Sequence, residues 1–137
     1  MKGRSASREC AFRLLFEASL RGPEALDGLE ITLRDQLEDE ESRHFCADLI
    51  GGVRARDAEL STMITQLSHN WDIKRLPTTE RIVILMGLHE MTAPVPIPAV
   101  VAIDEAVELA KRYGGADSPG FVNAILDAHR RKAAAGA

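Results

Sequence analysis

The sequence predicts an all-α protein, and three observations support that fold class. Apolar residues recur with helical spacing in the segments between proline and glycine breaks. A single apolar run, residues 82–88, resembles a strand, and no second such run exists with which it would pair. The chain has 137 residues, of which 45% are hydrophobic and 28% charged, a composition typical of soluble globular proteins. We therefore expect one helical domain over residues 1–137.

The first predicted helix begins by about Ser5 and ends before the Gly22-Pro23 break. Its apolar residues follow the spacing i, i+3, i+4, i+7 that gives a helix one face to bury. These residues are Ala11, Leu14, Leu15 and Ala18.

A second stripe on this helix joins two cations to two rings. Arg4, Arg8, Phe12 and Phe16 are each four residues apart and form one ridge. Such a ridge can hold single-stranded RNA, because guanidinium groups contact phosphates and rings stack on unpaired bases. The alternative is that the rings belong to the core and the arginines are solvated, and the spacing alone favours this alternative.

The run 82–88 is predicted to form a central helix that is buried on all sides. Its β-branched residues alone would also suit a buried strand. Its flanks, residues 79–81 and 89–91, extend the segment beyond the usual strand length. Pro77 and Pro98 are placed for the first turns of this helix and the next.

The next helix should bury Val100, Ile103, Val107 and Ala110 and stop at Gly114. Residues 95–97 lie between prolines and are expected to form an extended linker. Ser118 followed by Pro119 indicates the N-cap and first position of a last helix. A mild division near residues 67–71 predicts two helical subdomains, about 1–69 and 70–137, that share one core.

Catalytic and metal-binding signatures are absent from the sequence. The four histidines are scattered without metal-ligand spacing, and Cys10 and Cys46 suit reduced core thiols better than a disulfide. We expect no enzymatic activity, cofactor or metal. The longest apolar run is too short for a membrane span and the N-terminus is charged, which predicts a cytoplasmic protein.

The net charge of −4 argues against a nucleic-acid partner, but the acidity is local. Residues 24–41 contain eight acids and one base, Arg34. The first thirteen residues contain Lys2, Arg4, Arg8 and Arg13 and a single acid, Glu9. The N-terminal end of the chain is therefore basic.

Three blocks of the sequence resemble the NusB family. Residues 100–114 (VVAIDEAVELAKRYG), then Asp117-Ser118 and residues 121–127 (FVNAILD), are similar to the family's C-terminal signature in order and spacing. Residues 71–90, which begin at Trp71, resemble its central block, and residues 8–16 resemble its first helix. The resemblance covers almost the whole chain, and residues 24–41 are its least characteristic part.

This resemblance implies a fold of about seven helices in two small packed bundles. It also implies a transcription antitermination factor that binds boxA-type RNA of ribosomal RNA leaders together with NusE, a small-subunit ribosomal protein, in the antitermination complex of RNA polymerase. Some NusB-like proteins self-associate, so the resemblance also allows a homodimer of the free protein. By position, the implied RNA-binding residues are Arg4, Arg8, Phe16, Asp117, Ser118 and Phe121, and Glu80 would face NusE. We expect the N-terminal cations and the helix start near Ser118 to share one groove.

Departures from the family pattern put the boxA specificity in question. Arg4 is followed by Ser5-Ala6 where enterobacterial relatives have consecutive arginines, and Gly120 replaces a basic residue. Fewer cations predict weaker and less salt-dependent RNA binding. The alternative function is a NusB-like protein-interaction paralogue that has weak or lost RNA specificity.

Overall fold

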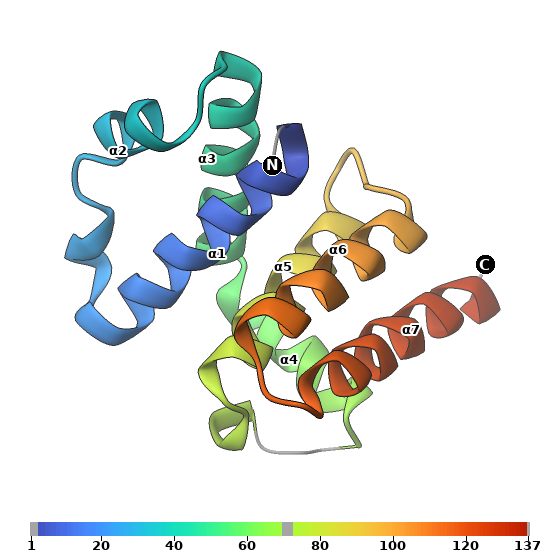
Figure 1. Ribbon diagram of the computed structural model, residues 1–137. Helices are drawn as coiled ribbons and strands as arrows, with labels where there is room; N and C mark the ends of the chain where they lie inside the picture. Colours follow the sequence, from blue (N-terminus) through green and yellow to red (C-terminus); the bar gives the residue numbers. More distant parts are fainter. Residues whose placement is uncertain (1–2, 70–72, 137) are drawn as a thin grey trace. The chain divides into compact units, whose positions relative to one another are not determined.

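The computed structural model describes residues 3–69 and 73–136, and these residues form seven α-helices and two 3₁₀ turns (Figure 1). The predicted all-α fold class and the number of helices are confirmed. Trp71 and Lys2 lie outside the described residues. The elements are α1 (Gly3–Arg21), η1 (Pro23–Leu26), α2 (Leu29–Gln36), α3 (Glu40–Ala55), α4 (Asp57–Leu67), η2 (Ile73–Arg75), α5 (Thr78–Thr92), α6 (Ala99–Tyr113) and α7 (Ser118–Gly136).

The chain divides into two compact units, residues 1–55 and 56–137. The division falls at the start of α4, earlier than the boundary near residue 69 that the sequence suggests. The reason is that α4 packs on α5 and α7, so its apolar face belongs to the second unit. The two units are described separately below.

The first unit is built on the packing of α1 against α3. The Ser7 hydroxyl donates a hydrogen bond of 2.8 Å to the carbonyl of Ser42 at the start of α3. The Asp39 carboxylate accepts bonds from the Ser42 amide at 2.9 Å and from its hydroxyl at 2.7 Å. Asp39 therefore caps α3, as an acidic residue before a helix does. The buried residues of this unit include Cys10, Ala11, Phe12, Leu14, Leu15, Leu33, Cys46, Leu49, Ile50 and Val53.

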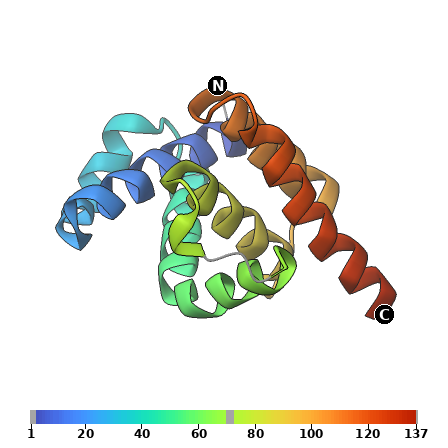
Figure 2. The ribbon, with the colours of Figure 1, turned by 90° about the horizontal axis from the view of Figure 1, so that it is seen from below.

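The second unit is organised around α5, which packs against α4, α6 and α7. Every residue from Ile82 to Leu88 is buried within the helix, so the predicted central helix is confirmed. Gly87 allows close packing here, because a Cβ at this position would lie 2.8 Å from Leu126 Cδ1. Figure 2 shows α7 as one uninterrupted helix whose last turns extend away from this unit, and residues 130–136 are exposed.

Several helix boundaries differ by one residue from the prediction. Pro77 and Pro98 occupy the N-cap positions of α5 and α6 instead of the first turns. Helix α7 begins at Ser118 itself, and the carbonyl of Asp117 accepts the first helical bond, from the Phe121 amide. The linker at 95–97 lies outside the helices, with a bend at Val95, and the Ile97 amide is bonded to the Glu90 carbonyl.

The apolar face of α6 was predicted only in part. Ile103 and Ala110 are buried, but Val100 is exposed and Val107 is half-buried. The buried face runs through Ala102, Ile103, Ala106, Leu109 and Ala110. None of the helices in the described ranges combines the length and the apolar character needed to cross a membrane.

Candidate nucleic-acid interface

Arg4 and Arg8 share one aromatic partner on α3. The guanidinium carbon of Arg4 lies 4.7 Å from the centre of the Phe45 ring, and that of Arg8 lies 5.1 Å from it. Both distances are within the range of a cation–π interaction. The spacing of four residues on α1 places both side chains on the same face, so one ring holds two cations.

The two arginines differ in exposure. Arg4 is exposed, whereas only 2% of Arg8 is accessible. The interpretation of both arginines as solvated is therefore wrong for Arg8. A guanidinium is hydrated more weakly than an ammonium and is the cation best suited to burial against an aromatic ring. Arg4 is therefore the cation of this pair that is accessible from solvent.

The aromatic part of the α1 stripe turns into the core. Phe12 is buried with 2% exposure, and the centre of its ring lies 5.8 Å from that of the half-buried Phe16. The core interpretation holds for Phe12. Phe16 lies two helical turns beyond Arg8, about 12 Å along the axis, and is partly accessible.

Phe45 is the residue that the sequence reasoning missed. It adjoins Cys46, which belongs to the buried face of α3 made by Ser42, Cys46, Leu49, Ile50 and Val53. Its position beside that face, four residues after Glu41, was the available signal. A large ring at the edge of a helix face is accessible to side chains of the neighbouring helix. The contact with α1 itself is tertiary and leaves no local pattern.

The start of α7 is built around the Ser118 side chain. Its hydroxyl accepts a bond of 3.0 Å from the Gly115 amide and donates to Oε1 of Glu80, in the first turn of α5. Gly114 has no room for a side chain, because a Cβ there would lie 2.5 Å from Ser118 Oγ and 2.8 Å from the Ala110 carbonyl oxygen. The buried Ser118 hydroxyl therefore lies at the centre of the turn between α6 and α7 and holds it through hydrogen bonds.

These contacts assign Ser118 and Glu80 a shared structural part in the second unit. Ser118 is buried with 3% exposure, and Glu80 is half-buried. The family resemblance implies that Ser118 contacts RNA and Glu80 faces NusE. In the structure the two side chains are hydrogen-bonded to each other. Asp117 is exposed beside them, and Phe121 is half-buried one turn further on.

The first turn of α7 offers few backbone donors for phosphate. The Ser118 amide donates to the Gly115 carbonyl and the Phe121 amide to the Asp117 carbonyl. Pro119 has no N–H. Among these first residues, Gly120 is the one whose amide those bonds leave unused, so this helix start offers an anion fewer N–H groups than a regular one.

The sequence-predicted site residues therefore fall into two groups. Arg4, Arg8 and Phe16 lie on α1 in the first unit, and Glu80, Asp117, Ser118 and Phe121 lie in the second unit. The expectation of one shared groove stays a prediction. Within residues 3–69 and 73–136, no three histidine, cysteine or acidic residues gather in a way that would hold a metal ion.

Comparison with known proteins identifies the family. The model of the NusB family matches residues 5–131. The chain belongs to the NusB family. It is 37% identical over 129 residues to the transcription antitermination protein NusB of Geobacter sulfurreducens, and the match covers 93% of each chain.

Solved structures agree with this membership. NusB of T. maritima superposes with a TM-score of 0.78 at 32% identity, covering 93% of this chain and 90% of that one. A NusB chain in a crystal structure with NusE and double-stranded RNA superposes with a TM-score of 0.81 over 91% of this chain and 93% of that chain. The identity to that chain is 21%, so this second likeness shows the fold alone. The NusB-family chain thus has the helical architecture that its sequence motifs predicted.

Proposed function

We propose that this protein is a transcription antitermination factor that binds boxA-type single-stranded RNA of ribosomal RNA leaders together with NusE, within the RNA polymerase antitermination complex. Membership of the NusB family supports this function. The observation that carries it is the exposed Arg4 guanidinium lying over the Phe45 ring. The RNA-binding residues proposed on α1 are Arg4, Arg8 and Phe16.

The ring contact prepares Arg4 for binding a nucleotide strand. A guanidinium over a ring has a restricted orientation, so less side-chain entropy is lost when it meets a phosphate or stacks on a base. Arg8, buried on the same ring, supports the ring and adds positive potential without a direct contact. The half-buried Phe16 ring is proposed to accept an unstacked base.

The second surface is proposed to involve the start of α7. Asp117 is exposed and Phe121 half-buried, so both can be reached by a partner or a base. Ser118 would act by holding the turn in place, because its hydroxyl is bonded within the unit. Glu80 is proposed to face NusE, and its Oε1 is bonded to Ser118, so the orientation of its carboxylate is set before NusE binds.

One observation favours the alternative of a protein-interaction paralogue. Because Arg8 is buried, Arg4 alone of the two proposed N-terminal cations is exposed, and the chain carries a net charge of −4. RNA affinity comes largely from phosphate contacts, so a weak general affinity would leave NusE binding as the main activity.

A titration separates the two functions. A fluorescent boxA-like RNA and a scrambled control of the same length are titrated with the protein, with and without NusE, at two salt concentrations. The antitermination proposal expects tighter binding to the boxA-like RNA, most clearly with NusE present. Equal binding to both RNAs, with NusE still bound, would establish the paralogue instead.

A further inference from the structure

The packing face of α7 continues beyond the part of the helix that the second unit covers. Val122 and Leu126, near the start of this face, are buried, His129 is half-buried and Ala133 is exposed. Their spacing of four, three and four residues keeps them on one side of the helix. Figure 2 shows the last turns of α7 leading away from the unit. The end of α7 therefore presents an uncovered packing face to solvent.

This uncovered face and the end of α4 form a pocket with a volume of about 290 Å³. Met63, Leu67 and Ala133 supply aliphatic carbon to its lining, and burying such carbon under another apolar side chain is favourable. The exposed Lys132 adds a positive charge at the pocket. An apolar side chain with a carboxylate beside it fits this combination. The full lining is Met63, Gln66 and Leu67 of α4 and His129, Lys132 and Ala133 of α7.

Positive charge predominates on α7 around the pocket. Arg130, Arg131 and Lys132 follow one another and are exposed. Asp127 is shared by both arginines, because its Oδ1 lies 2.7 Å from Nη2 of Arg130 and its Oδ2 lies 2.9 Å from Nε of Arg131. Burial and the charge of Lys132 lower the pKa of His129, so its ring is largely neutral at pH 7. One carboxylate thus faces three cations, and a surface that complements this one is acidic.

Helix α2 of the first unit has these complementary properties. Ile31 has 67% of its surface exposed, and it lies two residues from the buried Leu33, on the opposite side of the helix. Asp35 follows Ile31 by four residues and therefore lies beside it, and Glu30 precedes it. Both acids are exposed, and α2 contains a single base, Arg34. An exposed aliphatic side chain is thus flanked by carboxylates.

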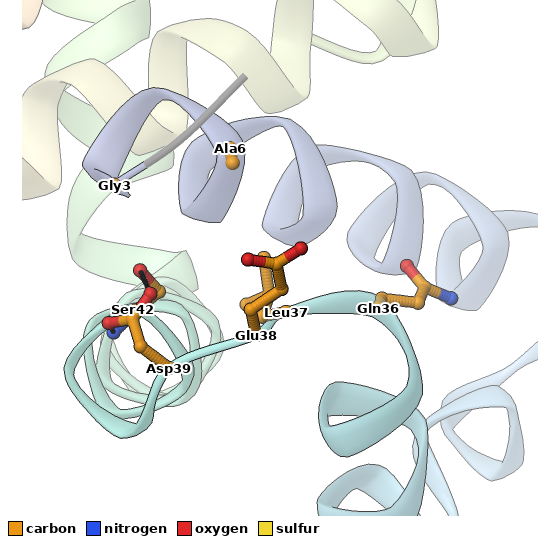
Figure 3. A pocket seen from close by; sticks show the side chains of 7 residues that line it. All are labelled: Gly3, Ala6, Gln36, Leu37, Glu38, Asp39 and Ser42. Atoms are coloured by element: carbon orange, nitrogen blue, oxygen red, sulfur yellow. Dashed lines mark hydrogen bonds between the residues drawn. The ribbon is translucent and has the colours of Figure 1, made fainter.

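Two acids that follow α2 are turned toward their own unit. Figure 3 shows the Glu38 side chain pointing toward α1 and Asp39 beside Ser42. The Asp39 carboxylate accepts two hydrogen bonds from Ser42, and Glu38 and Asp39 line a pocket of the first unit itself. The acids that α2 offers beside Ile31 are therefore Glu30 and Asp35.

We propose that the pocket between α4 and α7 binds α2 of a second copy of this chain, with Ile31 inserted in the pocket and Asp35 facing Lys132. Each copy carries both surfaces, so the contact joins the second unit of one copy to the first unit of the other. The cations of α7 would also attract RNA, but a phosphate leaves the aliphatic lining uncovered, whereas Ile31 buries it. This self-association does not depend on the proposed RNA-binding function.

Sedimentation velocity of the full chain, over roughly a hundredfold range of concentration, measures the association. We expect the mean mass to rise with protein concentration at low salt and to return toward that of the monomer at high salt, because salt screens the charges. A monomer at every concentration in low salt would overturn the proposal. A monomeric protein whose binding to a boxA-like RNA is weakened by Lys132→Glu would also overturn it, since the cations of α7 would then serve RNA.

Charge reversals on the two surfaces test which residues meet. Lys132→Glu and Asp35→Lys should each weaken self-association at least about tenfold, because each places like charges together. An equimolar mixture of the two variants should associate as the wild type does, because the two reversed charges attract each other across the contact. Arg54→Glu makes the same charge change as Lys132→Glu at an exposed site on α3, and it should leave the association unchanged. A mixture that stays monomeric, or equal weakening by Arg54→Glu, would contradict the pairing.

A variant of Ile31 tests the apolar part of the contact. Ile31→Ser leaves every charge in place, so the salt dependence should remain while the affinity between copies falls about tenfold or more. Because Ile31 is exposed, the first unit should keep its stability in this variant. Unchanged association of Ile31→Ser would show that this side chain does not fill the pocket and would overturn the proposal.

Discussion

Arg4 and Arg8 are one helical turn apart and lie over the same ring, but their different exposure gives them different roles. Arg4 is exposed and Arg8 is buried. An exposed cation is held weakly, whereas a buried one is part of the packing, because its removal leaves a cavity and an unsupported ring. The same residue type is therefore proposed to contact RNA at one position and is part of the packing at the other.

The stability of single alanine variants checks this difference. Arg8→Ala should lower the free energy of unfolding by about 2 kcal/mol, since it removes a desolvated cation–π contact and buried stem carbons. Arg4→Ala should stay within about 0.5 kcal/mol of the wild type. Urea denaturation measures both. An Arg8→Ala variant as stable as the wild type would show that its burial contributes nothing.

Two adjacent glycines offer a second comparison at the residue scale. At Gly114 an added Cβ would lie 2.5 Å from Ser118 Oγ, while at Gly115 nothing lies within 4 Å. We expect Gly114→Ala to lower the free energy of unfolding by about 1 to 3 kcal/mol through this clash, and Gly115→Ala to change it little. Thermal denaturation of the two variants tests this expectation. Equal melting temperatures would mean that the turn tolerates a side chain around Ser118.

At the scale of elements, Arg56 joins the start of α4 to α5. Its Nη1 lies 3.0 Å from Nδ1 of His89, and its Nε and Nη2 donate to the two oxygens of Glu59 at 3.0 Å each. A guanidinium donates and does not accept, so His89 Nδ1 must be the unprotonated acceptor. The pKa of His89 is lowered by burial and by the charge of Arg56.

The contacts of Arg56 with His89 and Glu59, here called the Arg56 clamp, predict that the free energy of unfolding falls in mild acid. Because the pKa of His89 is lower in the folded than in the unfolded chain, the unfolded chain binds the proton at higher pH. The contribution of His89 to the free energy of unfolding should be constant above about pH 6.5. It should decrease as the pH drops below that value. His129, whose pKa burial also lowers, contributes in the same direction.

Urea denaturation from pH 7.5 to pH 5 isolates the part of His89. His89→Gln keeps an acceptor for Arg56 and does not titrate, so its stability should fall less steeply than that of the wild type. The remaining slope is assigned to His129. Parallel curves for the two proteins would contradict the clamp.

Sequence patterns predicted elements better than the faces they bury. The flanks of residues 82–88 were enough to identify a buried helix, because strand length limits the alternative. The predicted buried face of α6 differs from the observed one, because Val100 and Val107 fit the helical spacing as well as Ala102 and Leu109 do. Only the packing of α5 and α7 against α6 decides which of these apolar residues is buried.

Site residues were predicted by family resemblance, and their roles depend on tertiary contacts. The stripe of Arg4, Arg8, Phe12 and Phe16 could be read from spacing, but the ring beneath the arginines comes from α3. The bond between Ser118 and Glu80 joins residues 38 positions apart. Nothing local in the sequence signals such a pair, so Ser118 was expected to meet RNA and is found buried.

For the whole molecule, the charge distribution predicts a shallow salt dependence of RNA binding. Each phosphate contact to single-stranded RNA contributes about 0.7 to the slope of log affinity against log salt. Arg4→Ala should therefore reduce the slope by about 0.7. Titrations of a boxA-like RNA in the presence of NusE, from about 50 to about 200 mM salt, measure this slope. An unchanged slope would mean that Arg4 does not contact phosphate.

The measurement that tests the central proposal most directly compares two arginines of α1. Arg4→Ala and Arg21→Ala change the net charge equally, and both residues are exposed on the same helix, but Arg21 pairs with Glu17 and has no assigned RNA role. Anisotropy titrations of a boxA-like RNA with NusE present should give several-fold weaker binding for Arg4→Ala and wild-type affinity for Arg21→Ala. Equal affinities for the two variants would contradict an RNA-binding surface at Arg4 and Phe45.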